Sequence, residues 1–294
     1  MNFTARRIVR ILHKLKLCKP RVIIPMDGGI CSQMNFYLSG EYIALTKNIP
    51  VEFDLSWFST NGKDMDGLQA RNFDLLKAFP NLPIKIASRW ECWVYKTFFE
   101  YHRDYHTQWW NENPPLYLLG YYAPPAIPLQ HFKDIFRLDP KSVLDVDEYT
   151  KYCSIPEEGS VAVHVRRGDL ATRDLPYYGQ ASPVDYFTKA VQHFLSINPD
   201  TIFYFFSDDI LYLKTTLIPQ LPQNLRYEIS ENNADKGYVD LFLISRCKHI
   251  ITSKGSLGKW AALLSDKTDR TIIVDRSDLN VSKLDAIESS VVLI

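Results

Sequence analysis

The chain has 294 residues, of which 46% are hydrophobic and 23% charged, values that suit one large or two medium globular domains. Its formal net charge of zero argues against a dedicated nucleic-acid binder, because neutralising phosphates requires a basic excess. The five cysteines are widely spaced without a CxxC pair, which is typical of free thiols in a reducing compartment. No apolar run is long enough for a transmembrane helix and no signal peptide is visible, so we expect a cytoplasmic protein.

The first 21 residues form a basic, amphipathic segment. It contains no acid and the following bases: Arg6, Arg7, Arg10, Lys14, Lys16, Lys19 and Arg21. Ile8, Leu12 and Leu15 fall at helical spacing, which predicts a helix with an apolar stripe. One interpretation is a surface helix that binds anionic lipid through residues 2–19, with the protein peripheral at the inner face of the plasma membrane. The alternative is a solvated helix that packs on the domain.

Residues 22–157 predict an N-terminal α/β domain, which opens with a strand, a glycine turn and a helix. The strand covers Arg21–Pro25, and the helix is expected over residues 35–45, after Gly28 and Gly29. The glycines allow a ligand to approach the backbone, and the N-terminus of a helix favours anions. A plain tight turn is the alternative interpretation of the glycine pair.

The remainder of this domain alternates strands with helices. We expect strands at 51–54, 84–87 and 116–122, a helix at 67–79 capped by Asp66, and helices between residues 127 and 152. Residues 90–122 are rich in aromatic side chains, which pack in a core or serve as platforms for sugar rings. The polar break at 156–160 places the domain boundary after residue 157.

Residues 158–294 predict a C-terminal domain in which strands and helices alternate more clearly. Strands are expected at 161–167, 201–206, 249–252 and 271–275, and helices at 183–195 with Ser182 as N-cap, from residue 209 through 217, at 238–246 and at 257–264. This repeated pattern is typical of a doubly wound parallel sheet, so the fold class is α/β.

Three of these strands end in polar loops, at Arg166–Asp169, Ser207–Asp209 and Ser253–Ser256. The carboxyl ends of parallel strands meet at one edge of a sheet, so arginines, acids, hydroxyls and a lysine–glycine loop converge there. Arginine suits phosphate because its planar fork donates two hydrogen bonds and keeps its charge. Arg166 and Arg167 therefore predict a diphosphate clamp. A surface arginine pair stabilised by the acid of the same loop is the alternative.

Four segments resemble motifs of glycosyltransferase family 11, the α-1,2-fucosyltransferases. They are the Gly-Gly-Ile-Cys-Ser-Gln-Met opening at 28–34, His-Val-Arg-Arg-Gly-Asp at 164–169, Phe-Ser-Asp-Asp at 206–209, and the segment from Asp240 to His249. Their order and spacing fit the family. The arginine motif and the segment from Asp240 to His249 are the specific ones, whereas the glycine opening is not.

The resemblance implies a GT-B type fold, in which two Rossmann-like domains face a central cleft. The N-terminal half would bind the acceptor and the C-terminal half a GDP-sugar, with no metal and no further cofactor. Arg166 would bond the β-phosphate and stabilise the departing GDP, Ser256 would bind phosphate, and His164 and Asp240 would lie near the guanosine. The acids of the two motifs would support the arginines. The expected donor-binding residues are Gly28, Gly29, His164, Arg166, Arg167, Asp169, Asp208, Asp209, Asp240, Ser253, Lys254 and Ser256.

The loop after the Asp240–His249 segment departs from the family pattern. Residues 254–262 read Lys-Gly-Ser-Leu-Gly-Lys-Trp-Ala-Ala, where the family usually has Asn-Ser-(Ser/Thr)-Phe-Ser-Trp-Trp-Gly-Ala. Cys31 and Ser32 likewise replace the Gly-Asn of the opening. Lys254 would add a phosphate contact. The lost polar groups suit a donor carrying either L-fucose or its 3-deoxy analogue, L-colitose.

The activity implied is that of an inverting galactoside α-1,2-fucosyltransferase-like enzyme. It would move L-fucose, or a close 6-deoxy-L-hexose such as L-colitose, from GDP to the 2-hydroxyl of a galactose-containing glycan or lipid-linked oligosaccharide in surface polysaccharide or O-antigen synthesis. Asp27, beside the glycine turn, is a geometric candidate for the general base, and a solvated or capping acid is the alternative. The competing functions are transfer from another nucleotide sugar and non-catalytic binding of GDP or glycan.

Overall fold

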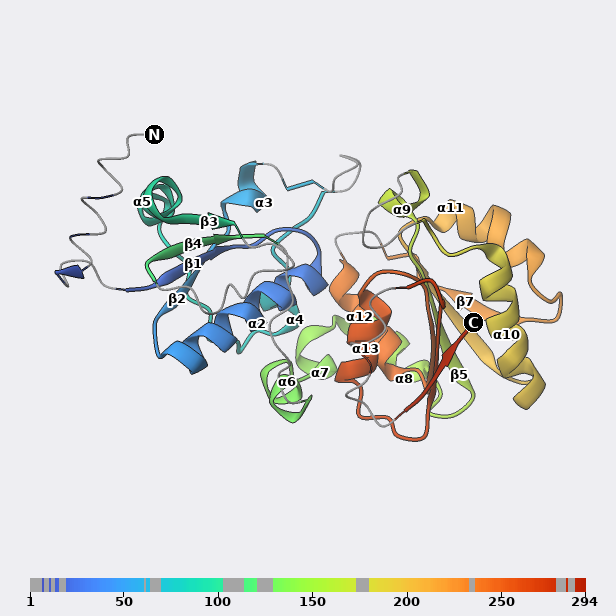
Figure 1. Cartoon of the computed structure of the whole chain (residues 1–294). Helices are drawn as coiled ribbons and strands as arrows, with labels where there is room; N and C mark the ends of the chain where they lie inside the picture. The colour runs from blue at the N-terminus through green and yellow to red at the C-terminus, as the bar shows by residue number, and fades with distance from the viewer. Residues whose placement is uncertain are drawn as a thin grey trace. The chain divides into compact units, whose positions relative to one another are not determined.

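The computed structural model describes residues 7, 11, 14–15, 20–60, 62–63, 70–102, 114–120, 129–172, 180–232, 236–278, 284 and 289–294. Most of the basic segment 2–19, the predicted cap Asp66 and part of the aromatic stretch 90–122 lie outside these ranges. The chain divides into two compact units (Figure 1). The N-terminal unit comprises Met1–Lys63, Arg71–Leu76 and Asn81–Ile127, and the C-terminal unit comprises Asp64–Ala70, Lys77–Pro80 and Pro128–Ile294.

The N-terminal unit is built on a parallel sheet of order β2-β1-β4-β3. Its strands are β1 (Val22–Pro25), β2 (Val51–Asp54), β3 (Glu100–His102) and β4 (Leu116–Leu119). Ile23 and Tyr117 are paired in the register and pack under helix α5 (Arg89–Phe99). Ile24 pairs with Phe53 and points to the other face, where Gly40 of α2 (Ile30–Lys47) lets the helix approach. A Cβ atom at Gly40 would lie 2.7 Å from the Phe53 ring, so the helix could not pack this closely with a larger residue.

The prediction of a helix over residues 67–79 is wrong for the residues that the structure describes. Residues 71–74 are irregular, and only α4 (Leu75–Ala78) is helical. The cause is the buried side chain of Gln33. Its Oε1 accepts the backbone N–H groups of Asp74 and Leu75, both at 2.9 Å, and its Nε2 donates to the Asn72 carbonyl at 2.8 Å. A side chain about 40 positions away thus satisfies backbone groups that a longer helix would have paired internally.

The rest of this unit adds short elements. Helix α3 covers Ser56–Thr60. The strand predicted at 84–87 is reduced to one bridge between Ile86 and Phe53, supported by backbone bonds from Phe53 to the Lys85 carbonyl and from Ala87 to Phe53. The sheet is therefore extended by a single bridge beyond β2.

The C-terminal unit contains a six-stranded parallel sheet of order β10-β9-β8-β5-β6-β7. Its strands are β5 (Ser160–Val165), β6 (Ile202–Ser207), β7 (Arg226–Ile229), β8 (His249–Thr252), β9 (Thr271–Val274) and β10 (Ser290–Leu293). The four central strands confirm the sequence prediction. The two edge strands were not predicted. Three of the four β7 residues are exposed, so no run of buried apolar residues marks that strand.

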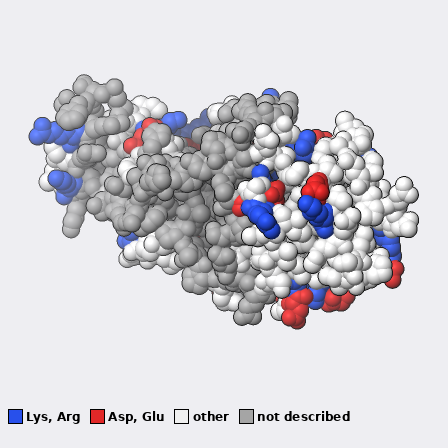
Figure 2. Space-filling view, turned by 45° about the vertical axis from the view of Figure 1, so that its right-hand side comes forward, with Lys and Arg blue, Asp and Glu red and all other residues white. Residues whose placement is uncertain are grey.

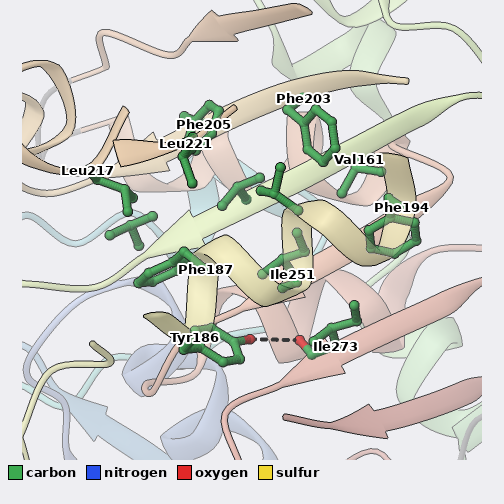
Figure 3. Close-up of a cluster of buried hydrophobic side chains, with 14 of the residues drawn as sticks. Val161, Tyr186, Phe187, Phe194, Phe203, Phe205, Leu217, Leu221, Ile251 and Ile273 are labelled. Atoms are coloured by element: carbon green, nitrogen blue, oxygen red, sulfur yellow. Dashed lines mark hydrogen bonds between the residues drawn. The ribbon is translucent and has the colours of Figure 1, made fainter. Parts of the chain in front are cut away.

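Helices cover both faces of this sheet. They are α6 (Leu129–Ile135), α7 (Pro140–Val143), α8 (Val146–Ser154), α9 (Gly168–Thr172), α10 (Val184–Ile197), α11 (Ile210–Tyr212), α12 (Gly237–Arg246) and α13 (Leu257–Leu264), with a π-helical turn at Leu213–Leu217 and a 3-10 turn at Ile218–Gln220. Figure 3 shows Phe187 of α10 beside the inward side chains of β5, β6 and β8. The Tyr186 hydroxyl lies 2.8 Å from the Thr252 carbonyl and 3.1 Å from the Ile273 carbonyl, which ties α10 to the strand ends.

Helices α6 to α8 belong to the C-terminal unit, so the boundary predicted after residue 157 differs from the observed division at Ile127 and Pro128. The ring centroids of Phe132 in α6 and Trp260 in α13 lie 4.9 Å apart. Lys236, just before α12, pairs with Glu148 of α8 at 2.7 Å. The polar break at 156–160 is therefore a loop inside this unit.

Both units are α/β with parallel sheets, which confirms the predicted α/β class and the two Rossmann-like domains. No helix among the described residues combines the length and apolar character needed to cross a membrane.

On the right-hand side of Figure 2, basic and acidic side chains lie next to one another in small groups. This mixture agrees with the neutral net charge of the chain.

Candidate functional site

The carboxyl edge of the C-terminal sheet brings the three predicted polar loops together. In the register, Val165 of β5 lies opposite Ser207 of β6, and His164 lies opposite Thr252 of β8. Each strand therefore ends at the same level, and the loop residues that follow become neighbours. This convergence is the geometry predicted from the sequence for parallel strands.

Arg166 is fixed on three sides by these loops. Its guanidinium pairs with Asp208 through Nη1 and with Asp169 through Nη2, the latter at 2.7 Å. Its backbone N–H donates to the Ser253 hydroxyl at 2.8 Å. The side chain is 22% exposed, so the guanidinium still reaches the surface of the edge. The arrangement presents a preoriented, permanently charged donor group.

The second arginine is held differently. The Arg167 N–H donates to the other oxygen of Asp208 at 2.8 Å, and its guanidinium carbon lies 3.9 Å from the Tyr212 ring centroid. Asp209, which we expected to support the arginines, accepts instead from the Tyr212 N–H at 2.9 Å and caps α11. Asp209 therefore orients the aromatic ring on which Arg167 stacks.

Glycine is required at the turn that follows the arginines. Gly168 has a φ of +24°, and a Cβ atom there would lie 2.7 Å from Oδ2 of Asp208. Gly255, with a φ of +101°, passes close to the Arg166 side chain. Both positions leave room for the Arg166–Asp208 pair.

His164 lies beneath this edge as a buried, neutral imidazole. Burial, and secondarily the charges of Arg166 and Lys259, lower the pKa of His164 to about 3. Its Nδ1 is buried without a hydrogen-bond partner in the described part of the chain. The predicted position beside the nucleotide remains a prediction for this residue.

The loop after β8 supplies a second cation and two hydroxyls. Lys254 is only 7% exposed and Ser253 is fully buried. Ser256 precedes α13 without a side-chain capping bond. Burial alone would raise the pKa of Asp275, but hydrogen bonds from Ser182 and Ser277 and the charge of Lys254 hold that pKa below its usual value. Lys254 therefore contributes positive potential at the sheet edge.

Asp240 lies in the first turn of α12 and is joined to the end of β7. Its Oδ1 accepts from the Ser230 hydroxyl at 2.9 Å and from the Asn232 amide at 2.7 Å. Burial raises the pKa of Asp240 to about 6 in spite of these two hydrogen bonds, which act in the opposite direction. Sequence reasoning missed Ser230 and Asn232 because it did not recognise β7.

Two further pairs near the carboxyl edge were also missed. Ser182, predicted as the N-cap of α10, instead donates to Asp275 at 2.6 Å, and α10 begins after Pro183 without a side-chain cap. Lys259, which stands where the family usually has tryptophan, forms a fully buried ion pair with Asp278. The carboxylate offsets part of the desolvation cost of the buried ammonium.

The N-terminal candidates Asp27, Gly28 and Gly29 belong to the other unit. They form the turn between β1 and α2, where Gly28 has a φ of +69° and a Cβ atom would lie 2.7 Å from Oγ of Ser32. Gln33 donates to the Gly28 carbonyl at 2.9 Å and so fixes this turn. The described contacts among the donor-binding candidates come from the C-terminal unit alone.

Comparison with known proteins identifies the family. Residues 116–289, more than half of the chain, match the model for Glycosyl transferase family 11. The chain therefore belongs to glycosyl transferase family 11 and is a glycosyltransferase.

Two curated relatives come from Escherichia coli. An α-1,2-colitosyltransferase is 23% identical over 265 residues, covering 83% of this chain and 88% of that protein. The O-antigen biosynthesis glycosyltransferase WbnK is 27% identical over 119 residues, covering 40% of this chain but only 38% of WbnK. The chain is thus related to colitosyl- and O-antigen glycosyltransferases.

Two solved structures show looser similarity. POFUT1 in complex with GDP-fucose gives a TM-score of 0.49 at 10% identity, covering 94% of this chain and 98% of that chain. The α-1,6-fucosyltransferase NodZ co-crystallised with GDP gives 0.47 at 14% identity, covering 86% of this chain and 96% of that chain.

Proposed function

We propose that this glycosyltransferase moves L-fucose, or a close 6-deoxy-L-hexose such as L-colitose, from GDP to the 2-hydroxyl of a galactoside. The acceptor oxygen forms the new bond to the anomeric carbon while the bond from that carbon to the diphosphate breaks, which inverts the configuration. GDP leaves with the bonding electron pair, and the acceptor proton goes to a base. Asp27 is our candidate for that base.

The fixed guanidinium of Arg166 is the observation that carries this proposal. Negative charge grows on the β-phosphate as the glycosidic bond breaks, and a preoriented cation acts most strongly where charge develops. Two carboxylates and the Ser253 hydroxyl hold the residue in place, so little reorganisation is needed during the reaction. Lys254 and Ser256 border the same loop and would add contacts to the diphosphate.

Asp240 and His164 are proposed on the nucleoside side. An ionised Asp240 is an acceptor for the two N–H groups of a guanine edge, a pairing that other bases do not reproduce. Ser230 and Asn232 leave its second carboxylate oxygen without a hydrogen bond among the described contacts. This chemistry supports GDP over UDP as the carrier.

The donor sugar is proposed from the relatives and from the loop at 254–262. The α-1,2-colitosyltransferase matches most of this chain. The loop lacks the asparagine, two hydroxyls and one tryptophan of the family pattern, which suits a sugar with fewer hydroxyls. The match to WbnK supports an acceptor in O-antigen or another surface polysaccharide, carried as a galactose-containing glycan or a lipid-linked oligosaccharide.

The test is mass spectrometry of products formed by the full chain. GDP-L-fucose and GDP-L-colitose are each offered with a panel of β-galactosides, and linkage is assigned by NMR. We expect α-1,2 products from at least one of the two donors. Arg166→Ala should lower the rate by roughly two to three orders of magnitude. Arg226→Ala, at the amino end of the same sheet, is the matched control and should retain full activity.

Other outcomes would assign a different function. Turnover with GDP-mannose or a UDP-sugar, and with neither 6-deoxy donor, would make the protein a transferase of another nucleotide sugar. GDP binding by calorimetry without transfer to any acceptor would make it a non-catalytic relative. Undiminished turnover by Arg166→Ala would remove the proposed role of that residue.

A further inference from the structure

Helix α5 carries two tryptophans on its exposed face. Cys92 and Tyr95 point inward and pack with Ile23 and Tyr117 in the core of the N-terminal unit. On the opposite side, Trp90 is 69% exposed and Trp93 54% exposed. Their rings stack with centroids 5.0 Å apart and an interplanar angle of 25°. Large aromatic side chains are usually buried, so an exposed stacked pair marks an interaction surface.

The surroundings of these tryptophans are apolar and basic. Ile86, which precedes the helix, is 53% exposed, and Arg89 and Lys96 are exposed on α5. Neither base pairs with an acidic side chain in the described part of the chain. Together Ile86, Trp90 and Trp93, flanked by Arg89 and Lys96, form what we term the Trp patch.

The single acid of α5 does not offset this charge at the Trp patch. Glu91 accepts from the Ser88 backbone and hydroxyl in a capping box, and it pairs with Arg21 at 2.8 Å. Arg21 in turn pairs with the buried Glu52 at 2.7 Å. These contacts fix the start of the helix on the sheet. The tryptophans are therefore presented on a rigid base and need little ordering to bind.

We propose that the Trp patch rests on an anionic membrane surface. Tryptophan rings favour the boundary between headgroups and acyl chains, where one edge is apolar and the N–H finds a polar partner. Each neighbouring base adds about 1 kcal/mol of attraction to acidic lipid. The basic segment 2–19 is a second membrane signal predicted from the sequence, and stable attachment usually takes two signals. The proposal depends on neither the donor nor the acceptor of the transfer reaction.

A glycan platform is the competing use of exposed aromatic rings. Sugar sites combine an aromatic face with polar groups that fix the hydroxyls. The exposed face of α5 offers two cations but no amide and no unengaged carboxylate, since Glu91 is already bonded. This composition favours lipid headgroups as the partner.

The experiment is flotation of the full chain with vesicles of phosphatidylcholine, alone or mixed with phosphatidylglycerol. The double variants Trp90→Ser/Trp93→Ser and Arg89→Glu/Lys96→Glu should each weaken partitioning into the mixed vesicles at least about tenfold. Two controls in the C-terminal unit should bind like the wild type. They are Leu211→Ser, a residue 72% exposed, and Arg137→Glu/Lys141→Glu, an exposed basic pair.

Three results would overturn the proposal. The first is an absence of binding by the wild type, and the second is equal binding by the wild type and both patch variants. In the third, Trp90→Ser/Trp93→Ser floats normally but loses affinity for a β-galactoside, which would assign a glycan platform. Because all four altered residues are exposed, circular dichroism should show unchanged folding, and the charge variant provides a test without the aromatic substitution.

Discussion

Asp208 contacts two consecutive residues through its two carboxylate oxygens. One oxygen pairs with the Arg166 guanidinium, and the other accepts a hydrogen bond from the backbone N–H of Arg167. The same acid thus fixes the direction of the Arg166 guanidinium and the path of the chain at Arg167. A neutral amide could accept the backbone N–H but could not form the ion pair. The two functions of Asp208 can therefore be separated by substitution.

Asp208→Asn should leave the fold intact and slow the transfer reaction. The guanidinium would keep its bond to Asp169 but lose its second anchor, and misplacement by about 1 Å can cost roughly a hundredfold in rate. The measurement is kcat and KM for the donor, with thermal unfolding alongside. Asp185→Asn, which removes an exposed acid of α10, is the control. Full kcat in Asp208→Asn would show that the ion pair does not position Arg166.

Because of His164, the protein should lose stability as the pH falls below 6.5, the ordinary pKa of a histidine side chain. Its pKa is lowered from 6.5 in the unfolded chain to about 3 in the folded protein, so the folded state binds fewer protons. The stabilisation is complete above pH 6.5 and is lost progressively between pH 6.5 and pH 3. The free energy of unfolding, measured with denaturant between pH 7.5 and 4.5, should depend on pH differently in the wild type and in His164→Gln. The slopes of these two plots against pH should differ by up to about 1.4 kcal/mol per pH unit. Parallel curves would contradict a buried neutral imidazole.

Asp240 should have the opposite effect on stability and a separate effect on donor binding. Its pKa is raised from 3.8 to about 6, so the stabilisation it provides is complete below pH 3.8 and is lost as the pH rises to 6. In the role proposed for Asp240, the ionised carboxylate accepts from guanine, so the Kd for GDP should rise as the pH falls below 6. Asp240→Asn should bind GDP about tenfold to a hundredfold more weakly, because a charge-assisted hydrogen bond is lost.

The stability of Asp240→Asn separates these two effects. The amide oxygen can still accept from Ser230 and Asn232, so the free energy of unfolding at pH 7.5 should equal or exceed that of the wild type. Calorimetry for GDP and denaturant unfolding provide the two measurements. Unchanged GDP affinity with reduced stability would assign Asp240 a purely structural role.

Gly258 should not tolerate the serine that its family usually has at the aligned position. A Cβ atom there would lie 2.8 Å from Cβ of Thr252 and 3.4 Å from Cβ of His164, so α13 would have to move away from β8. Gly258→Ser should destabilise the protein by about 1–3 kcal/mol. Gly237→Ala at the start of α12, where a Cβ meets nothing within 4 Å, is the control and should be neutral or stabilising. Equal stability of both variants would contradict the tight packing.

The central strands of the C-terminal sheet and the loops at their ends are predictable from local sequence patterns alone. Buried runs such as Val161–Val165 and Phe203–Phe206 have a local pattern, and parallel strands bring their carboxyl ends to one edge wherever they lie in the order. For that reason the sequence pattern predicts that Arg166, Asp208 and Ser253 lie close together. Two of these loops, at Arg166–Asp169 and Ser207–Asp209, also belong to segments that resemble motifs of the family.

The pairs between residues far apart in the chain become visible only in the folded protein. Gln33 with Asp74, Ser182 with Asp275, and Lys259 with Asp278 have no signal in spacing or periodicity. The assignment of α6 to α8 to the C-terminal unit and the exposure of Trp90 likewise depend on packing. Local patterns follow from the repeat of the backbone, whereas these contacts follow from how distant segments fill space and satisfy one another's polar groups.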